Sequence, residues 1–360
     1  MPARAVAPAL SPRSVRGNRT GFRLGLLHLF CLLVIMLTGV EARGQSYTVV
    51  SIVPENGGSI GSAISAVSGN TEYSISAATG AVSRIAGTGL PVTAQNTRAL
   101  VTIRCTVTSG NGCGTNANNA PSANITLTAG SFTGRTAALK NFRAAAGTGT
   151  PSATQGTGST FSFTVKSVPG NNSTTTFYVG ADFTVTTSGN SGTATANYTL
   201  TASGAANPSG SSSSSAFSAT VTRPISLVES SALSFGNVYR PTTDTGTVVT
   251  ISESNGALSF SGGNGGSAGG TTSRAQYTVS GENGQTFSVT LGSSTMTMNG
   301  SAGGSITVNL VRSATSGTLT GGSASAAGTA TVGVGGNFNI TKTTPPGAYT
   351  GTFTVTVDYN

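Results

Sequence analysis

The end of the chain restricts most strongly what this sequence can fold into. From Tyr349 to Tyr359, apolar or glycine positions alternate strictly with threonine or aspartate. Val334, Phe338 and Ile340 mark a strand that precedes them across a Pro-Pro-Gly turn. A period of two over this length predicts a half-buried β-strand, and proline and glycine are typical of turns. The sequence therefore predicts a hairpin that closes a β-domain. Its structural residues are predicted to be Phe338, Pro346, Gly347, Tyr349, Gly351, Phe353, Val355, Val357 and Tyr359.

An earlier segment repeats this pattern. Val179–Thr201 aligns with Val334–Thr356 without a gap, and the apolar strand positions and the turn glycines, Gly192 and Gly347, stay in phase. This agreement predicts two copies of one domain type, each ending in the same hairpin. The alternative is that two hairpins rich in threonine and glycine align through composition alone.

The rest of the chain favours an all-β fold. Charged residues make up 8% of the sequence and tryptophan is absent, while Val, Ile, Phe and Tyr occur in short alternating segments between turn signals. Such spacing is typical of antiparallel β-sandwiches, and the lack of helical segments argues against a parallel α/β sheet. A β-solenoid is the alternative fold, but no repeat of about 20–30 residues is found.

Composition also predicts the domain boundaries. Residues 202–216 are almost entirely small and polar, and such a segment typically forms a flexible linker; a long surface loop is the alternative. We therefore expect an N-terminal sandwich at residues 45–201, a Ser/Gly-rich linker at 202–216, and a C-terminal sandwich at 217–360.

Residues 1–44 have the organisation of a secretory signal peptide. A basic segment without acidic residues leads into the apolar run Leu24–Leu37, and small residues follow near a cleavage site. A retained membrane anchor is the alternative, although the run is short for a membrane span. We expect an exported protein, located in the periplasm, on the outer cell surface or outside the cell, with no transmembrane span after cleavage.

The leader also explains much of the basic charge. The formal net charge is +9, but six basic residues lie in the leader and the remaining chain has no Lys/Arg stripe. Nucleic-acid binding is therefore not expected. The six leader residues are Arg4, Arg13, Arg16, Arg19, Arg23 and Arg43.

Two cysteines, Cys105 and Cys113, remain after the leader, separated by a segment that contains a Gly-Asn-Gly turn. In an oxidising compartment this pair is predicted to form a local disulfide. A redox or metal pair is the weaker alternative, because the spacing is not Cys-x-x-Cys and no histidine follows the leader.

The sequence contains no recognisable catalytic motif. The absence of histidine after the leader removes Ser-His-Asp and Cys-His arrangements, and the glycine-rich run 261–270 lacks the ending of a phosphate-binding loop. We expect no enzyme activity, no cofactor and no metal site. The carboxylates after the leader are dispersed: Glu55, Glu72, Asp182, Glu229, Asp244, Glu253, Glu282 and Asp358.

The second half resembles a known family. The segment Phe235-Gly-Asn-Val238, the segment Ala275–Gly281 and the closing Pro-x-Gly-x-Tyr-x-Gly-x-x-x-Val-x-Val-x-Tyr are similar to an uncharacterised family of exported bacterial domains. The match covers about residues 222–360. The closing element also resembles the last strand of spore-coat-U-like and chaperone–usher pilin subunits. This resemblance implies immunoglobulin-like, pilin-like sandwiches at the cell surface or in the periplasm, and it implies no catalytic residue. A simple pilin, unlike this chain, has one short domain.

Two functions remain from the sequence. The first is a structural or adhesive surface protein, a component of a pilus, fibre or coat that contacts itself or other subunits through edge strands; a segment such as Tyr47–Val53 would add to a neighbour's sheet. The alternative is a module that binds envelope or extracellular glycan, in which tyrosines such as Tyr239 and Tyr277 stack on sugars.

Overall fold

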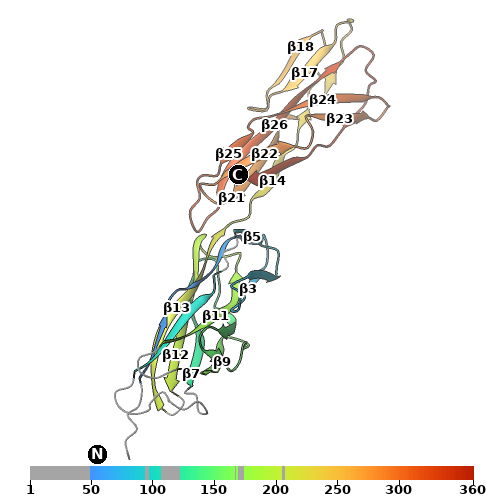
Figure 1. Ribbon diagram of the computed structural model, residues 1–360. Helices are drawn as coiled ribbons and strands as arrows, with labels where there is room; N and C mark the ends of the chain where they lie inside the picture. Colours follow the sequence, from blue (N-terminus) through green and yellow to red (C-terminus); the bar gives the residue numbers. More distant parts are fainter. Residues whose placement is uncertain (1–48, 94–96, 107–121, 167, 169–173, 205–206) are drawn as a thin grey trace, which may run out of the picture. The chain divides into compact units, whose positions relative to one another are not determined.

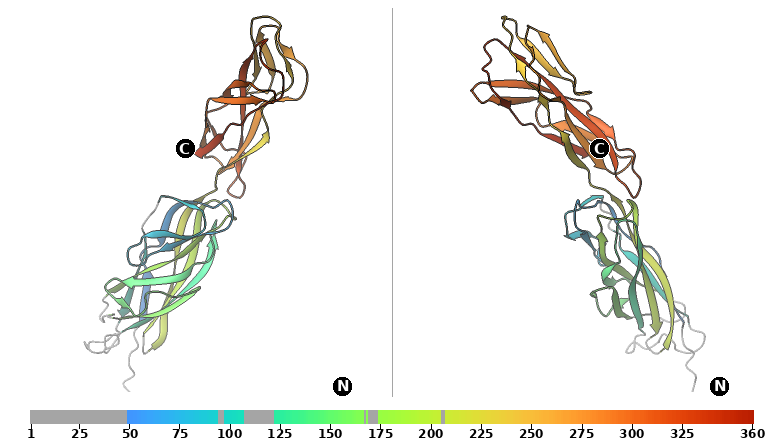
Figure 2. Two further views of the ribbon diagram at one scale, coloured as in Figure 1. Left: turned by 90° about the vertical axis from the view of Figure 1, so that its right-hand side faces the viewer. Right: turned by 180° about the vertical axis from the view of Figure 1, so that it is seen from behind.

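The computed structural model describes residues 49–93, 97–106, 122–166, 168, 174–204 and 207–360. All regular structure in these ranges is β-strand, and the ribbons in Figures 1 and 2 show no helix. The all-β prediction is confirmed. The strands form two sandwiches, which are described separately below.

The N-terminal sandwich contains two sheets, with strand orders β1-β6-β11-β3-β4 and β5-β2-β13-β12-β7-β10-β9, and β8 also pairs with β11. All pairs are antiparallel except β13 with β2, which is parallel, so the prediction of purely antiparallel sheets was wrong at this pair. The strands are β1 (Val49–Pro54), β2 (Gly58–Ile64), β3 (Thr71–Ile75), β4 (Val82–Ala86), β5 (Leu90–Thr93), β6 (Ala99–Thr106), β7 (Ala123–Thr133), β8 (Lys140–Ala146), β9 (Thr150–Pro151), β10 (Thr160–Lys166), β11 (Thr174–Val185), β12 (Gly192–Gly204) and β13 (Asn207–Thr222).

The N-terminal sandwich has one continuous apolar core between its sheets. In several strands alternate residues point inward, as in β3, where Thr71, Tyr73 and Ile75 are buried and the residues between them are not. Tyr198 and Phe217 lie in this core with their ring centroids 5.5 Å apart. Burial of one face of such a strand is what period-two patterns predict.

The C-terminal sandwich has shorter strands. Its main sheet joins β14, β21, β26, β24, β23 and β27, with β17 paired to β26 and β18 paired to β17, and β25-β22-β28 forms a second sheet. The strands are β14 (Ser226–Ser231), β15 (Ser234–Phe235), β16 (Val238–Tyr239), β17 (Thr247–Ile251), β18 (Leu258–Gly262), β19 (Gly266–Ser267), β20 (Thr272–Ser273), β21 (Ala275–Gly281), β22 (Thr286–Leu291), β23 (Thr295–Gly300), β24 (Ser305–Arg312), β25 (Ser316–Thr318), β26 (Gly328–Ile340), β27 (Tyr349–Thr350) and β28 (Val355–Tyr359).

The two sandwiches share one topology in their first sheets. The order β1-β6-β11-β3-β4 corresponds to β14-β21-β26-β17-β18, and β24 pairs with β26 as β8 pairs with β11. The equivalence extends beyond the segment that the sequence analysis aligned, because residues 71–103 also match residues 247–279 without a gap. The structure thus contains two versions of one strand arrangement.

The predicted Ser/Gly-rich linker at 202–216 was wrong. Residues 207–222 form β13, which pairs with β12 from Gly192 to Gly204, and Figure 1 shows the two strands side by side. Phe217, Ala219 and Val221 belong to the N-terminal core. The N-terminal sandwich therefore extends from β1 to Thr222, and the C-terminal sandwich begins after it instead of at residue 217. Serines at alternate inward positions are small enough to lie over a packed face, and composition alone hid this strand.

The predicted closing hairpin was also wrong as a pairing. β26 pairs with β17, β21 and β24, β27 pairs with β23, and β28 pairs with β22. β26 and β28 therefore lie in different sheets and do not pair with each other. The same holds for β11 and β12. The predicted alternation itself is correct: Phe353, Val355, Val357 and Tyr359 are half-buried and the threonines between them are exposed.

Candidate functional site

Matching hydrogen bonds show which positions of the two sandwiches are equivalent. Arg98 donates from Nη1 to the carbonyl oxygen of Ala77 at 2.9 Å, and Arg274 donates to that of Glu253 at 2.8 Å, 176 residues later in each case. Each arginine also bonds the next carbonyl, of Ala78 or Ser254. These contacts fix the equivalence independently of composition.

A second matched pair lies at the start of β3 and β17. Thr71 and Thr247 are fully buried, and their hydroxyl oxygens accept hydrogen bonds from the N–H groups of Gly89 and Gly265 at 2.8 and 2.9 Å. A third pair lies at β2 and β15. The N–H group of Gly61 donates to the hydroxyl of Ser59, two residues earlier, and the N–H group of Gly236 donates to that of Ser234.

The sandwiches differ at one sheet edge. In the N-terminal sandwich β12 lies between β7 and β13, and β13 in turn pairs with β2. Its counterpart β28 pairs with β22 on one side, and no strand of the described ranges pairs with the other side. The counterparts of β2, which are β15 and β16, pair with β20 and β19 and not with β28. The C-terminal sandwich thus has an open edge where the N-terminal sandwich has β13.

The backbone N–H and C=O groups of β28 point alternately toward β22 and toward the open edge. Gly292 donates from its N–H to the carbonyl of Thr354, and Asn360 donates to the carbonyl of Thr286, so even-numbered residues face β22. In an antiparallel ladder the intervening residues direct their N–H and C=O groups to the opposite side. Val355, Val357 and Tyr359 therefore present unpaired backbone donors and acceptors along the open edge.

Apolar side chains accompany these backbone groups. In the N-terminal sandwich Tyr198, Leu200 and Ala202 are at most 2% exposed, beneath β13. The equivalent residues of the C-terminal sandwich are Phe353, Val355 and Val357, and all three are only half-buried although they pack on the core. An unpaired edge that borders exposed apolar surface is a ready template for another strand.

The far end of β28 is held in place. The hydroxyl of Tyr359 donates to the carbonyl of Arg223 at 3.0 Å and accepts from the N–H of Glu282 at 2.6 Å. Burial raises the pKa of this phenol, with the neighbouring Glu282 and Arg223 acting in smaller and partly opposing ways. The open edge is thus anchored by its own sandwich.

Two predictions on strand donation and the disulfide have different outcomes. The segment Tyr47–Val53 was proposed as a strand for a neighbour, but Val49–Pro54 is β1 and pairs with β6 of its own sandwich. That proposal was wrong, since the segment is already paired. Cys105 lies in β6, whereas Cys113 falls outside the described residues, so the disulfide stays a prediction.

The predicted glycan-stacking tyrosines lie in different settings. Tyr277 is 9% exposed and packs in the core, and burial raises its pKa, whereas Tyr239 is 53% exposed. The structure therefore does not bring the two rings together as a platform.

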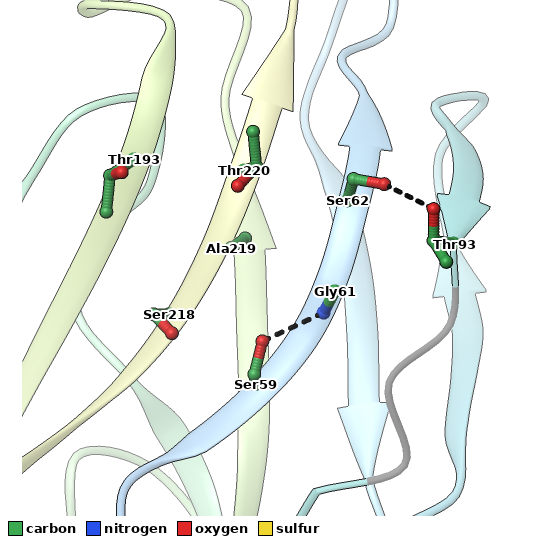
Figure 3. Close-up of a pocket in the computed structure, with 8 residues that line it drawn as sticks. All are labelled: Ser59, Gly61, Ser62, Thr93, Thr193, Ser218, Ala219 and Thr220. Atoms are coloured by element: carbon green, nitrogen blue, oxygen red, sulfur yellow. Dashed lines mark hydrogen bonds between the residues drawn. The ribbon is translucent and has the colours of Figure 1, made fainter.

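A shallow hollow of about 340 Å³ lies on the N-terminal sandwich, over β2, β5, β12 and β13 (Figure 3). Hydroxyls dominate it: Ser62 donates to Thr93 at 2.9 Å, and Ser59 accepts from the N–H of Gly61. No aromatic or charged side chain lines it. The lining residues are Ser59, Gly61, Ser62, Thr93, Thr193, Ser218, Ala219 and Thr220.

Four of the eight carboxylates in the described ranges form ion pairs. Asp182 is 1% exposed and accepts hydrogen bonds from Arg143 and Asn141, both at 2.7 Å, and Glu72 pairs with Lys140. The described ranges contain no group of three or more His, Cys, Asp or Glu side chains that could hold a metal ion. Within the same ranges, no helix is long and apolar enough to cross a membrane.

Comparison with known proteins gives a family match for the second sandwich. Residues 225–359 match a domain of unknown function, DUF4402. The resemblance to an uncharacterised domain family is thereby confirmed over the part of the chain where it was expected.

Other comparisons add little. No curated protein matches. Among solved structures, the chain is similar to the CsuC–CsuE chaperone–tip adhesion subunit pre-assembly complex from archaic chaperone–usher Csu pili of Acinetobacter baumannii, with 8% identity, a TM-score of 0.27, and coverage of 86% of this chain and 100% of that one. The similarity is too low to assign residues or a function.

Proposed function

We propose that this protein is a non-catalytic structural or adhesive component of an exported bacterial surface assembly, and that it joins the assembly through the open edge of β28. One observation carries the proposal. In the N-terminal sandwich β13 lies over Tyr198, Leu200 and Ala202, which are buried. Their counterparts in the C-terminal sandwich are half-buried and lie beside backbone groups that have no partner strand in the described ranges. The leader predicted at residues 1–44 and the dispersed carboxylates support an exported protein without enzyme activity.

Strand addition suits this edge physically. An added strand supplies partners for the outward N–H and C=O groups of Val355, Val357 and Tyr359, and its side chains cover apolar surface. Each buried CH₂ group contributes about 0.8 kcal/mol, so a strand that covers several half-buried side chains gives a stable contact. Binding at a flat polar surface would gain neither term.

The proposal is tested in the cells that naturally produce the protein. Val357→Pro removes an outward N–H while leaving the ladder to β22 intact, because proline lacks only its own donor. We expect the natural protein to run, without heating, as a high-mass species on SDS gels that heating converts to the monomer. Val357→Pro should abolish that species, and Thr356→Ala, on the exposed face of the same strand, should retain it. A wild-type protein that is monomeric with and without heating contradicts the proposal.

Glycan binding is the second candidate, and the hydroxyl-lined hollow of Figure 3 favours it. Its test is retention on peptidoglycan or polysaccharide, measured for the natural chain and for Ser218→Val. Saturable retention that Ser218→Val removes would support this function.

A further inference from the structure

We infer that Asn56 is a site of spontaneous deamidation, at which the side-chain amide is lost as ammonia and a carboxylate takes its place. The inference goes beyond the proposed function and does not depend on the open edge of β28. It starts from the sequence, which contains six Asn-Gly dipeptides. Asn111-Gly112 lies outside the described ranges, and the five within them begin at Asn56, Asn255, Asn264, Asn283 and Asn299.

An Asn-Gly pair carries its own nucleophile. Once the backbone N–H of the glycine gives its proton to water, the nitrogen attacks the side-chain carbonyl carbon, Cγ, of the asparagine. A C–N bond forms, the side-chain nitrogen takes up a proton and leaves as ammonia, and a five-membered cyclic imide remains. Water opens the imide at either carbonyl and gives aspartate or isoaspartate. Glycine favours ring closure because no Cβ stands beside the attacking nitrogen, and the two reacting groups are already held in one molecule.

The structure restrains four of the five described pairs. A glycine N–H that donates a hydrogen bond is held toward its acceptor, and loss of its proton also costs that hydrogen bond. The nitrogen of such a glycine is a poor nucleophile toward the neighbouring side chain. The four bonds run from Gly256 to the carbonyl of Ser252 at 2.9 Å, from Gly265 to the hydroxyl of Thr247 at 2.9 Å, from Gly284 to the carbonyl of Leu319 at 2.7 Å, and from Gly300 to the carbonyl of Gly304 at 3.0 Å.

Asn56 lacks this restraint. Asn56 and Gly57 lie between β1 and β2, both are exposed, and the N–H group of Gly57 has no hydrogen-bond partner in the described ranges. The side-chain carbonyl oxygen, Oδ1, of Asn56 accepts a hydrogen bond from the N–H of Leu100 at 2.8 Å. A donor at this oxygen stabilises the negative charge that develops on it during attack. Three of the other asparagines also accept a backbone N–H at Oδ1, so the free nitrogen of Gly57 is what distinguishes Asn56.

Conversion of Asn56 has a structural consequence, because β1 and β2 belong to different sheets of the N-terminal sandwich. In isoaspartate the main chain passes through the former side chain and becomes one carbon atom longer. The fold has little room for this change, since a Cβ on Gly57 would lie 2.5 Å from the carbonyl oxygen of Ala216 in β13. The Leu100 N–H also loses its present acceptor. We therefore expect isoaspartate at position 56 to weaken the pairing of β1 with β6 and to lower the melting temperature.

The test follows the exported full chain during storage in mildly alkaline buffer, and mass spectrometry after digestion quantifies each Asn-Gly peptide. We expect Asn56 to convert at least tenfold faster than each of the other four described asparagines, with isoaspartate present in its peptide. In denaturant the five should convert at similar rates, because the fold is what separates them. Equal rates in the folded chain overturn the inference. A tenfold preference that persists in denaturant also overturns it, because the neighbouring sequence would then be its cause.

Thr247→Val gives a matched test of the explanation. Valine has nearly the shape of threonine but cannot accept the hydrogen bond from Gly265, so Asn264 should convert at least tenfold faster in this variant. Asn255, in the same sandwich, should keep its rate, which shows that the variant is folded. An unreactive Asn264 in the folded variant overturns the role assigned to the free glycine nitrogen. If Asn255 accelerates as well, the comparison of rates in the natural chain decides alone.

Asn56→Gln tests the structural consequence. Glutamine has one more methylene group and would have to close a six-membered ring, so it converts far more slowly. Storage should lower the melting temperature of the natural chain by several degrees and leave that of Asn56→Gln unchanged. Equal losses in the two chains would place the damage elsewhere and overturn the consequence assigned to Asn56.

Discussion

Tyr198 and Phe353 occupy the same position in the two sandwiches, yet the first is completely buried and the second is half-buried. The local sequences are alike, and the strands before them, β11 and β26, have equivalent neighbours. The difference comes from β13, which lies beside β12 and has no described counterpart beside β28. Whether an amphipathic strand is fully covered thus depends on a neighbouring strand that lies outside its own alternating pattern. The following predictions test this comparison, from the largest expected effect to the smallest.

Removing the Phe217 ring should have the largest effect. Phe217 is fully buried between Tyr198 and the core, and Phe→Ala substitutions at such sites cost about 3–5 kcal/mol. We expect Phe217→Ala to lower the free energy of unfolding of the N-terminal sandwich by this amount, measured by hydrogen exchange on the full chain. Amides of β26 should be unaffected. A loss below about 1 kcal/mol would mean that β13 does not complete this sandwich.

High pH should destabilise the N-terminal sandwich through Tyr198. Burial raises the pKa of Tyr198 to about 12, and the nearby Ser215 hydroxyl acts weakly in the opposite direction. Since the folded pKa exceeds the ordinary value of about 10, the stabilisation is present below pH 10 and is lost as pH rises toward 12. The difference between a pKa of 10 and one of 12 corresponds to a loss of about 2.7 kcal/mol in the free energy of unfolding.

The matched control for this pH effect is Tyr198→Phe, which places in the N-terminal sandwich the residue type found at Phe353. Chemical denaturation between pH 9 and 12 should show a steeper loss of stability for the natural chain than for the variant. Parallel curves would contradict the assigned titration of Tyr198.

The repeated arginines should have similar effects in both sandwiches. Arg98 and Arg274 each donate to two consecutive carbonyls, and hydrogen bonds of charged groups contribute about 1.5–3 kcal/mol. Arg98 also lies 3.3 Å from the ring centroid of Tyr178, which adds about 0.5–1 kcal/mol at a partly exposed site. Arg98→Ala should therefore cost slightly more than Arg274→Ala in thermal unfolding. A neutral effect at either position would show that the repeated geometry does not stabilise the fold.

The smallest effect is expected at the open edge. Val355 is half-buried, so Val355→Ala should reduce the stability of the C-terminal sandwich by less than about 1 kcal/mol. The equivalent Leu200→Ala, beneath β13, should cost about 2–5 kcal/mol. Equal costs for both substitutions would remove the contrast between the two edges.

Much of the architecture follows from local sequence. The alternation of Phe353, Val355, Val357 and Tyr359 with threonine fixed a strand and its inner face, because successive side chains in a strand point to opposite sides. The in-phase repeat of Val179–Thr201 indicated two copies of one domain type. These conclusions needed only residues that are close together in the chain.

The partners of those strands were decided by tertiary structure alone. A period of two says which side chains face inward but not which strand lies alongside, so the predicted hairpin of β26 and β28 proved to connect different sheets. Composition likewise assigned residues 202–216 to a linker, since serine has little to bury, whereas residues 207–216 belong to β13 and pair in the sheet along β12. The open edge of β28 became visible only once that strand was in place, because an unpaired edge is a property of neighbours and not of the strand itself.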